Sequence, residues 1–388
     1  MKYLPTYLLI LVLLVLAGLS AYNYFKQPFF QDTETDSTIS QVEKFSPKPT
    51  PPPKKDLRSI DKLAQLIAVP IEAEEVASDA SESARMLRFI KDFQPGTVVY
   101  FGEQISTTSA VLAGQKIVDN FSEADYLPFI GVDHEGGAVQ RLSGEGFTKL
   151  ESWQKIVTSY SSAQQKAVFN QSALELYEAG INIVFGPVVD LASSSAVLKT
   201  RATGDLEQTF AATSNFIYSF AQYNIMPVIK HFPGLGSLKQ DPHFVAAAVS
   251  PSRDDTVIFS RVLDRFSNIG LMSTHVRVTD KFTGQVCSLS VDCVGKLPEL
   301  YPNVLLFTDD LNMAAAKIAP GSNVVDRSLA EVAVEALKAG NDVLLFGRGV
   351  TAEELESVLF ALEKEYEDSA SFRARVEASL AKVIKLKK

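Results

Sequence analysis

Acidic, basic and imidazole side chains recur at or just after the ends of short apolar runs in this 388-residue sequence. The residues at these positions are Asp133, Asp190, Lys230, His231, His275, Asp309 and Asp310. Carboxylates and imidazoles are the side chains that most often serve as nucleophiles, general acids and general bases. His134 and His243 lie at or just after such positions too, so all four histidines belong to the pattern. We therefore predict one catalytic centre assembled from several distant segments.

The apolar runs themselves have the length and composition of buried strands. Each has four to eight residues, mostly Val, Ile, Leu or Phe, without the polar alternation of a half-exposed strand, which is typical of parallel strands covered on both faces. The runs are Ala64–Val69, Thr97–Phe101, Leu127–Val132, Asn182–Val189, Met226–Ile229, Ile269–Met272, Asn303–Phe307 and Asp342–Phe346. Helices are expected between them, among them Arg327–Ala339, Ala352–Tyr366 and Ser371–Leu386.

Eight strands alternating with helices predict an α/β fold, a (β/α)8 barrel of the TIM type, with a doubly wound open sheet as the alternative. In such a barrel the C-terminal ends of the strands meet on one rim, and active sites lie there. The polar side chains listed above would then come together at that rim.

Composition and charge restrict the class of protein. The chain has 46% hydrophobic and 21% charged residues, which excludes a wholly disordered protein. The net charge is −9, whereas a duplex-binding protein usually carries a basic surplus, so nucleic acid is not an expected partner. The two cysteines, Cys287 and Cys293, are too few for a zinc ribbon or an iron–sulfur site. They form either a small disulfide or two core thiols.

The N-terminus differs from the rest of the chain. The 23 residues between Lys2 and Lys26 are uncharged, which is enough to cross a bilayer. We predict an uncleaved transmembrane signal anchor at 1–25, with a cleaved signal peptide as the alternative. Residues 26–55 contain six of the 18 prolines and predict an extended linker, and 56–388 is the expected catalytic domain. The charges flanking the apolar run weakly favour an extracytoplasmic, membrane-anchored domain, or a secreted one if the peptide is cleaved.

Three motifs in this order resemble those of one known family. They are D-H-E-G-G-A-V-Q-R at 133–141, K-H-F-P-G-L-G at 230–236 followed by D-P-H at 241–243, and T-D-D-L-N-M at 308–313. This pattern is similar to that of the bacterial β-N-acetylglucosaminidases of glycoside hydrolase family 3, and the resemblance covers roughly 56–388. It departs from the family at Ala138, Leu235, Pro242 and Thr308, where Arg, His, Ser and Ser are usual, and the stretch from Arg201 lacks the usual R-S-F. These departures bear on substrate range and rate more than on the type of reaction.

The resemblance implies a role for each matching residue. Asp309 corresponds to the nucleophile, and His243 with its partner Asp241 corresponds to an acid/base dyad on a loop. A carboxylate of this kind can form a covalent glycosyl-enzyme, and an imidazole beside a carboxylate can exchange protons near neutral pH. Residues matching positions that hold the sugar are Asp133, Arg141, Arg201, Lys230 and His231. From the residues alone, Asp133 and Arg141 would equally form a buried structural ion pair, and Gly136-Gly137 a tight turn.

The resemblance implies a retaining exo-β-N-acetylglucosaminidase that acts on terminal GlcNAc of cell-wall or muropeptide fragments and needs no metal or organic cofactor. Three alternatives remain open. A glycoside phosphorylase would intercept the same covalent intermediate with phosphate. A catalytically weak wall-binding homologue would bind without turnover. A metal-dependent barrel hydrolase would use Asp133, His134, His231 and His275, although no His-x-His ligand pair is present.

Overall fold

The computed structural model describes residues 57–121, 126–192, 197–279, 284–319, 321–322 and 324–387. Parallel strands within them follow one another around a sheet in the order of the chain. These strands are β1 (Ile67–Glu72), β2 (Thr97–Phe101), β3 (Phe129–Gly136), β5 (Ile183–Val188), β6 (Met226–Phe232), β8 (Gly270–Ser273), β10 (Leu305–Thr308) and β11 (Leu344–Leu345). A parallel bridge between Phe307 and Val343 joins β10 to the residue before β11 and closes the sheet. The predicted (β/α)8 barrel is therefore confirmed, and the open-sheet alternative is wrong.

Each of the eight predicted apolar runs overlaps one strand, but several strands end later than expected, and for two of them, β3 and β6, this bears on the site. β3 continues to Gly136, beyond the predicted end at Val132, and β6 continues to Phe232, beyond Ile229. Asp133 and Lys230 therefore lie within strands and not in the loops that follow them. These charged residues interrupt the hydrophobic pattern. The strands continue through them because the two side chains form an ion pair with each other.

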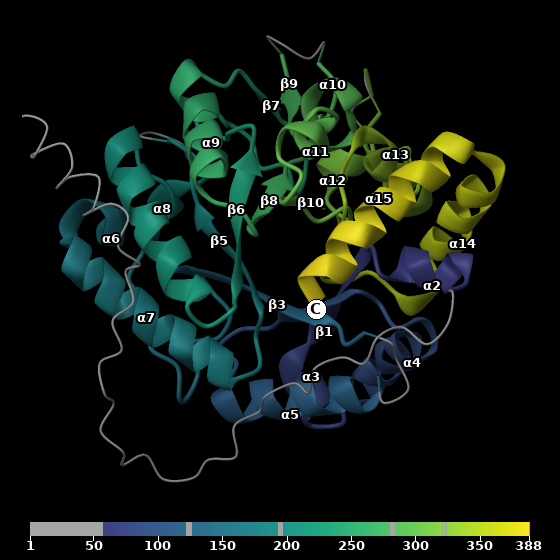
Figure 1. Ribbon diagram of the computed structural model, residues 1–388, viewed down its shortest axis with the longest axis horizontal. Coiled ribbons are helices and arrows are strands. Elements are labelled where there is room, and N and C mark those ends of the chain that lie inside the picture. Colours follow the sequence, from purple (N-terminus) through teal and green to yellow (C-terminus); the bar gives the residue numbers. More distant parts are fainter. Residues whose placement is uncertain are drawn as a thin grey trace, which may run out of the picture. The chain divides into compact units, whose positions relative to one another are not determined.

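Helices surround the strands on all sides of the barrel (Figure 1). Their bounds are α2 Ser59–Ala64, α3 Ala73–Ala77, α4 Ala84–Phe93, α5 Thr107–Asp119, α6 Trp153–Ser159, α7 Ser162–Glu178, α8 Leu206–Ala221, α9 Arg253–Arg265, α10 Val291–Val294, α11 Leu297–Leu300, α12 Ala314–Lys317, α13 Leu329–Ala339, α14 Ala352–Asp368 and α15 Ala370–Lys387. The last three confirm the predicted C-terminal helices. Ser328 caps α13 through a capping box with Glu331, and Gly340 follows it at φ 129°.

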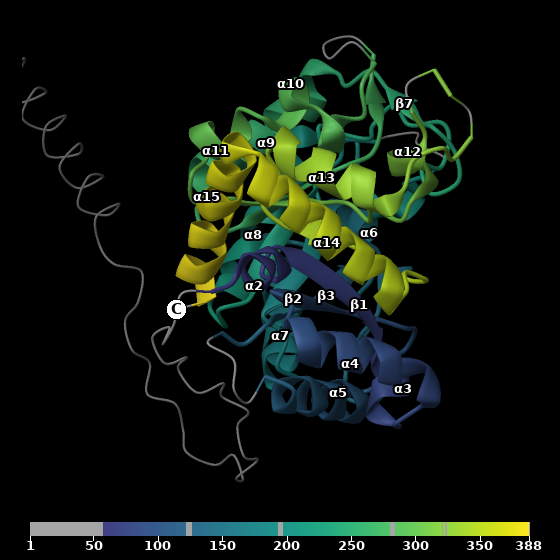
Figure 2. The same ribbon diagram turned by 90° about the vertical axis from the view of Figure 1, so that its right-hand side faces the viewer.

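Figure 2 shows the direction of the strands. β1 runs from α2 to α3, and the C-terminal end of α15 lies near α2, at the end where the strands begin. α12, which follows β10, lies at the opposite end. That opposite end is the rim on which the polar side chains are expected to meet.

The barrel interior is filled by aromatic and branched side chains. The rings of Phe185 on β5 and Phe307 on β10 pack edge to face with their centroids 5.6 Å apart. Gly270 on β8 makes room for this core, because a Cβ there would lie 2.7 Å from Val228 and 3.1 Å from Phe307. The interior is thus closely packed, and function is left to the rim.

Shorter elements decorate the rim. β3 turns into β4 (Val139–Gln140) through Gly136 and Gly137, both at positive φ, so the tight turn predicted for these glycines is confirmed. β7 (Ala248–Val249) pairs with β9 (Arg277–Val278), and short 3-10 helices occupy Ser81–Ser83, Lys199–Arg201 and Cys287–Leu289. Cys287 and Cys293 form a disulfide, which decides between the two possibilities left by the sequence.

The predicted anchor at 1–25 and linker at 26–55 lie outside the described residues. Within the part of the chain that the structure describes, no helix is both long and apolar enough to cross a membrane.

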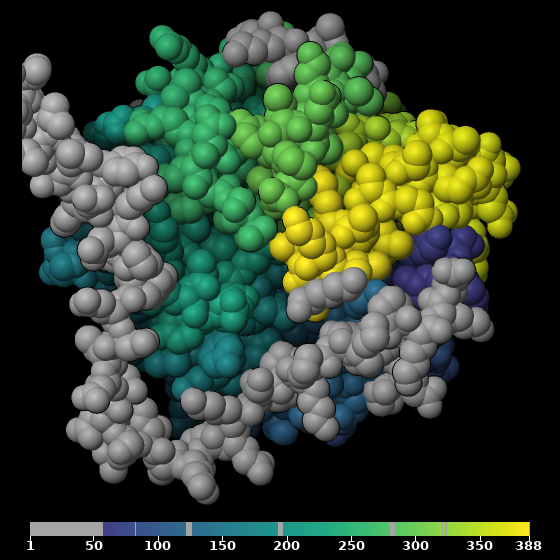
Figure 3. Space-filling view, in the orientation of Figure 1, coloured from purple at the N-terminus to yellow at the C-terminus, as the bar shows by residue number. Residues whose placement is uncertain are grey.

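A cavity of about 740 Å³ opens at the end of the barrel where the strands begin. Phe129, Met226 and Ile269 line it together with Leu386 near the end of α15. Figure 3 looks onto this end of the molecule, with α15 in yellow. The cavity is separated from the polar rim by the full length of the barrel strands.

Candidate active site

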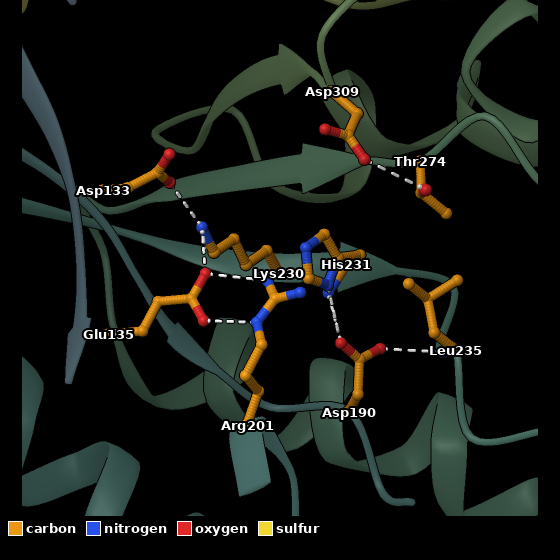
Figure 4. A network of polar contacts seen from close by, with 9 residues as sticks. All are labelled: Asp133, Glu135, Asp190, Arg201, Lys230, His231, Leu235, Thr274 and Asp309. Carbon is orange, nitrogen blue, oxygen red and sulfur yellow. Dashed lines mark hydrogen bonds and ion pairs between the residues drawn. The ribbon is translucent and has the colours of Figure 1, made fainter. Parts of the chain in front are cut away.

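Polar side chains from two strands and from the segment directly after a third strand meet at the C-terminal rim of the barrel. Asp133 and Glu135 project from β3, Lys230 and His231 from β6, and Asp309 directly follows β10 (Figure 4). Asp133 and Glu135 are two residues apart on one strand, so they point to the same side. The sequence prediction that distant segments converge on this rim is confirmed for these residues.

An ionic network connects β3, β6 and the short helix at Lys199–Arg201. Lys230 Nζ donates to Asp133 Oδ1 at 2.8 Å and forms an ion pair with Glu135 Oε1 at 2.7 Å. The Arg201 guanidinium binds the same glutamate through both oxygens, at 2.7 and 2.8 Å. The four charges sum to zero, which permits Glu135 and Lys230 to be buried. Asp133 and Arg201 are about a quarter exposed, so they remain accessible to a ligand.

Electrostatics keep this network ionised. Burial alone would raise the pKa of Glu135, but Lys230 and Arg201 hold it well below its ordinary value. Burial would likewise lower the pKa of Lys230, but Asp133 and Glu135 raise it above the ordinary value. The network therefore presents fixed charges that can form short, charge-assisted hydrogen bonds to a polar ligand.

Asp309 is held as a carboxylate at the rim. Its Oδ2 accepts a hydrogen bond from Thr274 Oγ1 at 3.2 Å, and its Oδ1 accepts one from the backbone N–H of Asp310 at 2.9 Å. Burial would raise its pKa, but the nearby imidazoles of His231, His275 and His243 and the Asp310 N–H lower it overall. An ionised carboxylate with fixed orientation can act as a nucleophile.

Asp310 and His275 fix the conformation of the segment that follows β10. Asp310 Oδ1 accepts the backbone N–H groups of Asn312 and Gly347, at 2.8 and 2.7 Å, while burial and the neighbouring Asp309 raise the pKa of Asp310 to about 6. His275 is completely buried between Ser288 Oγ, at 2.6 Å from Nδ1, and the Asp310 carbonyl, at 3.0 Å from Nε2. Both ring nitrogens of His275 are engaged within the protein, so it orders the loop after β10.

His243 and Asp241 lie on the loop between β6 and β7. His243 Nδ1 and Asp241 Oδ1 are 2.7 Å apart, and the same oxygen accepts the His243 backbone N–H at 3.0 Å. Burial would raise the pKa of Asp241, but these hydrogen bonds from His243 lower it. The loop rests on α12, where Ala314 N–H donates to the His243 carbonyl at 3.3 Å. The two side chains predicted to act as a dyad are therefore in contact, and the His243 ring is more than half exposed.

Two expectations from the sequence are corrected. Arg141 does not pair with Asp133, whose partner is Lys230; its backbone N–H donates to the Asp133 carbonyl at 3.1 Å, and its Nε has no hydrogen-bond partner among the described residues. His134 points away from the rim, because alternate residues of a strand face opposite sides. Its Nε2 lies 2.7 Å from Ser172 Oγ on α7, and burial lowers its pKa to about 3.

The metal-hydrolase alternative required His134 and His275 beside Asp133 and His231, and the structure does not bring these four together. Among the described residues no three His, Cys, Asp or Glu side chains are grouped so that they could hold a metal ion.

The sequence prediction missed the roles of Glu135 and Asp190. The spacing of two between Glu135 and Asp133, which places both side chains on one face of a strand, is the local signal for Glu135. Asp190 follows β5, and its Oδ2 lies 2.7 Å from the Nδ1 of His231. Neither contact partner is close in sequence, so only the fold brings them together.

The fold of the chain agrees with comparisons to known proteins. A model of the Glycosyl hydrolase family 3 N terminal domain matches residues 59–386. The chain therefore belongs to this family and is a glycoside hydrolase.

Similar curated proteins carry related names. A "Beta-hexosaminidase" of Nitrosospira multiformis is 31% identical over 241 residues, which cover 58% of this chain and 66% of that protein. "Beta-hexosaminidase LpqI" of Mycobacterium tuberculosis is 26% identical over 343 residues, 84% of this chain and 82% of that protein. Among solved structures, a beta-N-acetylhexosaminidase from Beutenbergia cavernae superposes with a TM-score of 0.74 at 21% identity, covering 86% of this chain and 99% of the other. This last similarity bears on the fold.

Proposed function

We propose that the protein is a retaining exo-β-N-acetylglucosaminidase that hydrolyses terminal β-linked GlcNAc, with peptidoglycan-derived fragments as its natural substrates. The observation that carries the proposal is an ionised Asp309 at the barrel rim together with a His243–Asp241 dyad on an adjacent loop. The names of the curated relatives support the choice of an N-acetylhexosamine as the sugar.

In the first step an Asp309 oxygen attacks the anomeric carbon and the bond to the leaving-group oxygen breaks. His243, with Nδ1 held by Asp241, donates its Nε2 proton to that oxygen. The product is a covalent glycosyl-enzyme. In the second step the neutral His243 accepts a proton from water as the water attacks the anomeric carbon, and Asp309 is released.

Sugar binding is assigned to the neighbouring charged groups. The oxygens of Asp133, about a quarter exposed, and the guanidinium of Arg201 face the rim beside Lys230, and His231 lies between this network and Asp309 (Figure 4). Arg141, whose backbone N–H donates to the Asp133 carbonyl, lies beside this network, and we assign its guanidinium as a further donor for the ligand. Two acceptors and several donors in fixed positions suit a ligand with many hydroxyl groups and one amide.

The location we propose is extracytoplasmic, with the domain tethered by residues 1–25 and spaced by the linker at 26–55. The Cys287–Cys293 disulfide supports this, because disulfides persist mainly in oxidising compartments.

The decisive experiment is turnover of an aryl β-GlcNAc glycoside, with NMR detection of the anomer released first. Retention gives β-GlcNAc, and release of GlcNAc 1-phosphate only with added phosphate would instead identify a phosphorylase. Asp309→Ala is expected to lower kcat by roughly three decades or more while the barrel stays folded. The matched control is Asp264→Asn, an exposed carboxylate on α9, which leaves turnover unchanged. An Asp309→Ala variant with near wild-type turnover would eliminate Asp309 as the nucleophile, and absence of turnover by the wild type on every GlcNAc glycoside would favour a binding homologue.

A further inference from the structure

Asp190 is a completely buried carboxylate on which donors from two different functional segments converge. Its Oδ2 accepts the backbone N–H of His231 at 3.1 Å and lies 2.7 Å from the Nδ1 of the same residue. Its Oδ1 accepts the backbone N–H of Leu235 at 2.8 Å. Figure 4 shows the carboxylate between the His231 ring and Leu235. Its side chain is 0% exposed, so no part of it can touch a substrate.

The contact with Nδ1 determines which nitrogen of His231 is available to a ligand. A carboxylate accepts hydrogen bonds, so the Nδ1 atom of His231 carries a proton in this geometry. In the neutral ring this leaves Nε2 as an acceptor, and in the charged ring it makes Nε2 a donor. Without Asp190 the neutral ring is free to carry its proton on Nε2, which removes the acceptor.

The contact with Leu235 fixes the start of the loop that carries the acid/base dyad. Leu235 lies three residues after the end of β6, and Asp241 and His243 follow on the same loop. Gly236 beside it packs so closely that a Cβ would lie 2.3 Å from the Leu191 carbonyl. One carboxylate therefore anchors the segment after β5 to both a ligand-facing ring and the base of the catalytic loop.

Strand pairing does not need this side chain. The Val189 backbone N–H already donates to the Lys230 carbonyl at 2.9 Å, and Val188 is in register with Lys230. Burying a carboxylate also costs free energy unless its oxygens accept hydrogen bonds. The three hydrogen bonds are thus directed at His231 and the loop, beyond what the sheet requires.

We propose that Asp190 is a positioning residue, which sets the tautomer of His231 toward the sugar and holds the base of the His243 loop. The inference rests on the proposed function for the roles of His231 and His243, but its first test uses no substrate. The chain has four histidines, so labelling with 15N-histidine gives a small set of ring signals. Two-bond 1H–15N correlation spectra separate protonated from bare ring nitrogens, and a His231→Gln variant assigns the His231 signals.

In the wild-type protein at pH 8, His231 is expected as the Nδ1–H tautomer. A wild-type spectrum with a bare Nδ1 and a protonated Nε2 overturns the proposal directly, whatever the variants do. This result does not depend on the identity of the substrate, so its failure is distinguishable from failure of the proposed hydrolase activity.

Asp190→Asn tests whether this side chain holds both the His231 ring and the base of the loop. The carboxylate has two acceptor oxygens, one for each, whereas the amide has one oxygen and one NH2 group. Either His231 changes tautomer, or the amide turns its NH2 toward Leu235 and loosens the loop. The first outcome appears in the NMR spectrum. The second appears as a larger loss of kcat/KM for aryl glycosides with poor leaving groups than for activated ones, because His243 delivers its proton less well. In both cases we expect kcat/KM to fall about 100-fold for poor leaving groups.

The matched control is Asp342→Asn. Asp342 is also 0% exposed and accepts hydrogen bonds from Ser379 and Lys382, but it precedes β11 at the other end of the barrel. We expect this control to lower thermal stability without altering the His231 tautomer or the leaving-group dependence. An Asp190→Asn protein that behaves in the same way, with only stability lost, contradicts the positioning role.

Discussion

Replacing Glu135 by Gln tests whether the ionic network on β3 and β6 is a charged structure, as its geometry indicates. The network contains two carboxylates and two cations, so the substitution leaves one uncompensated positive charge. The Glu135 side chain is 1% exposed and that of Lys230 3% exposed. Removing one partner of a buried ion pair costs about 3–5 kcal/mol. Because Asp133 and Arg201 are about a quarter exposed, we expect the lower end, about 3 kcal/mol.

The stability of the wild-type protein should also depend on pH through this residue. The folded-state pKa of Glu135 lies well below the value of about 4.3 in an unfolded chain. Its contribution is therefore fully present above that pH and is lost as the pH falls toward the folded-state pKa. Glu135→Gln should flatten the decline of the free energy of unfolding below about pH 5.

Urea unfolding at pH 7 and pH 4, with thermal scans, measures both effects. A loss of about 3 kcal/mol corresponds to a decrease in Tm of roughly 4 °C for a domain of this size. The control is Glu207→Gln, which removes an exposed ion pair with Arg261 between α8 and α9, and should change stability little. If Glu135→Gln is as stable as the wild type and declines as steeply in acid, Glu135 is protonated in the folded protein and the network described above is wrong.

Three further predictions concern other parts of the chain. His243→Ala should slow cleavage most for substrates with poor leaving groups, and azide should partly restore turnover of activated substrates. Asp241→Asn should give a milder form of the same pattern. An equal loss for every leaving group means that another residue is the acid. Replacing Cys287 and Cys293 by Ser should lower the free energy of unfolding by about 2 kcal/mol, the loop-closure value for a sequence separation of six. A reductant should lower the stability of the wild type by the same amount. If urea unfolding shows no difference, the disulfide is not formed. A chain lacking residues 1–55 should be soluble and active, and failure of this chain to fold while the full chain is stable in detergent means that the domain begins earlier.

The order of secondary structure could be predicted from local sequence. The eight apolar runs mark the eight strands because parallel strands buried on both faces require uninterrupted Val, Ile, Leu and Phe. Capping residues such as Ser328 and the stop at Gly340 mark helix ends for equally local reasons. The roles of Asp309, His243 and Asp241 are predictions from motifs, and the structure shows that Asp309 directly follows β10 and that His243 contacts Asp241.

The contacts inside the site could not be read from the sequence. Asp133 lies 97 residues from Lys230, and Glu135 lies 66 residues from Arg201, so no local pattern relates them. Polar residues also end a hydrophobic run whether the strand stops or continues, which is why β3 and β6 were predicted too short. Local sequence specifies which side chains can do chemistry and which segments form strands. Closure of the barrel decided which of them meet, because it alone places the ends of β3, β5, β6 and β10 on one rim and sends alternate side chains, such as His134, to the other side.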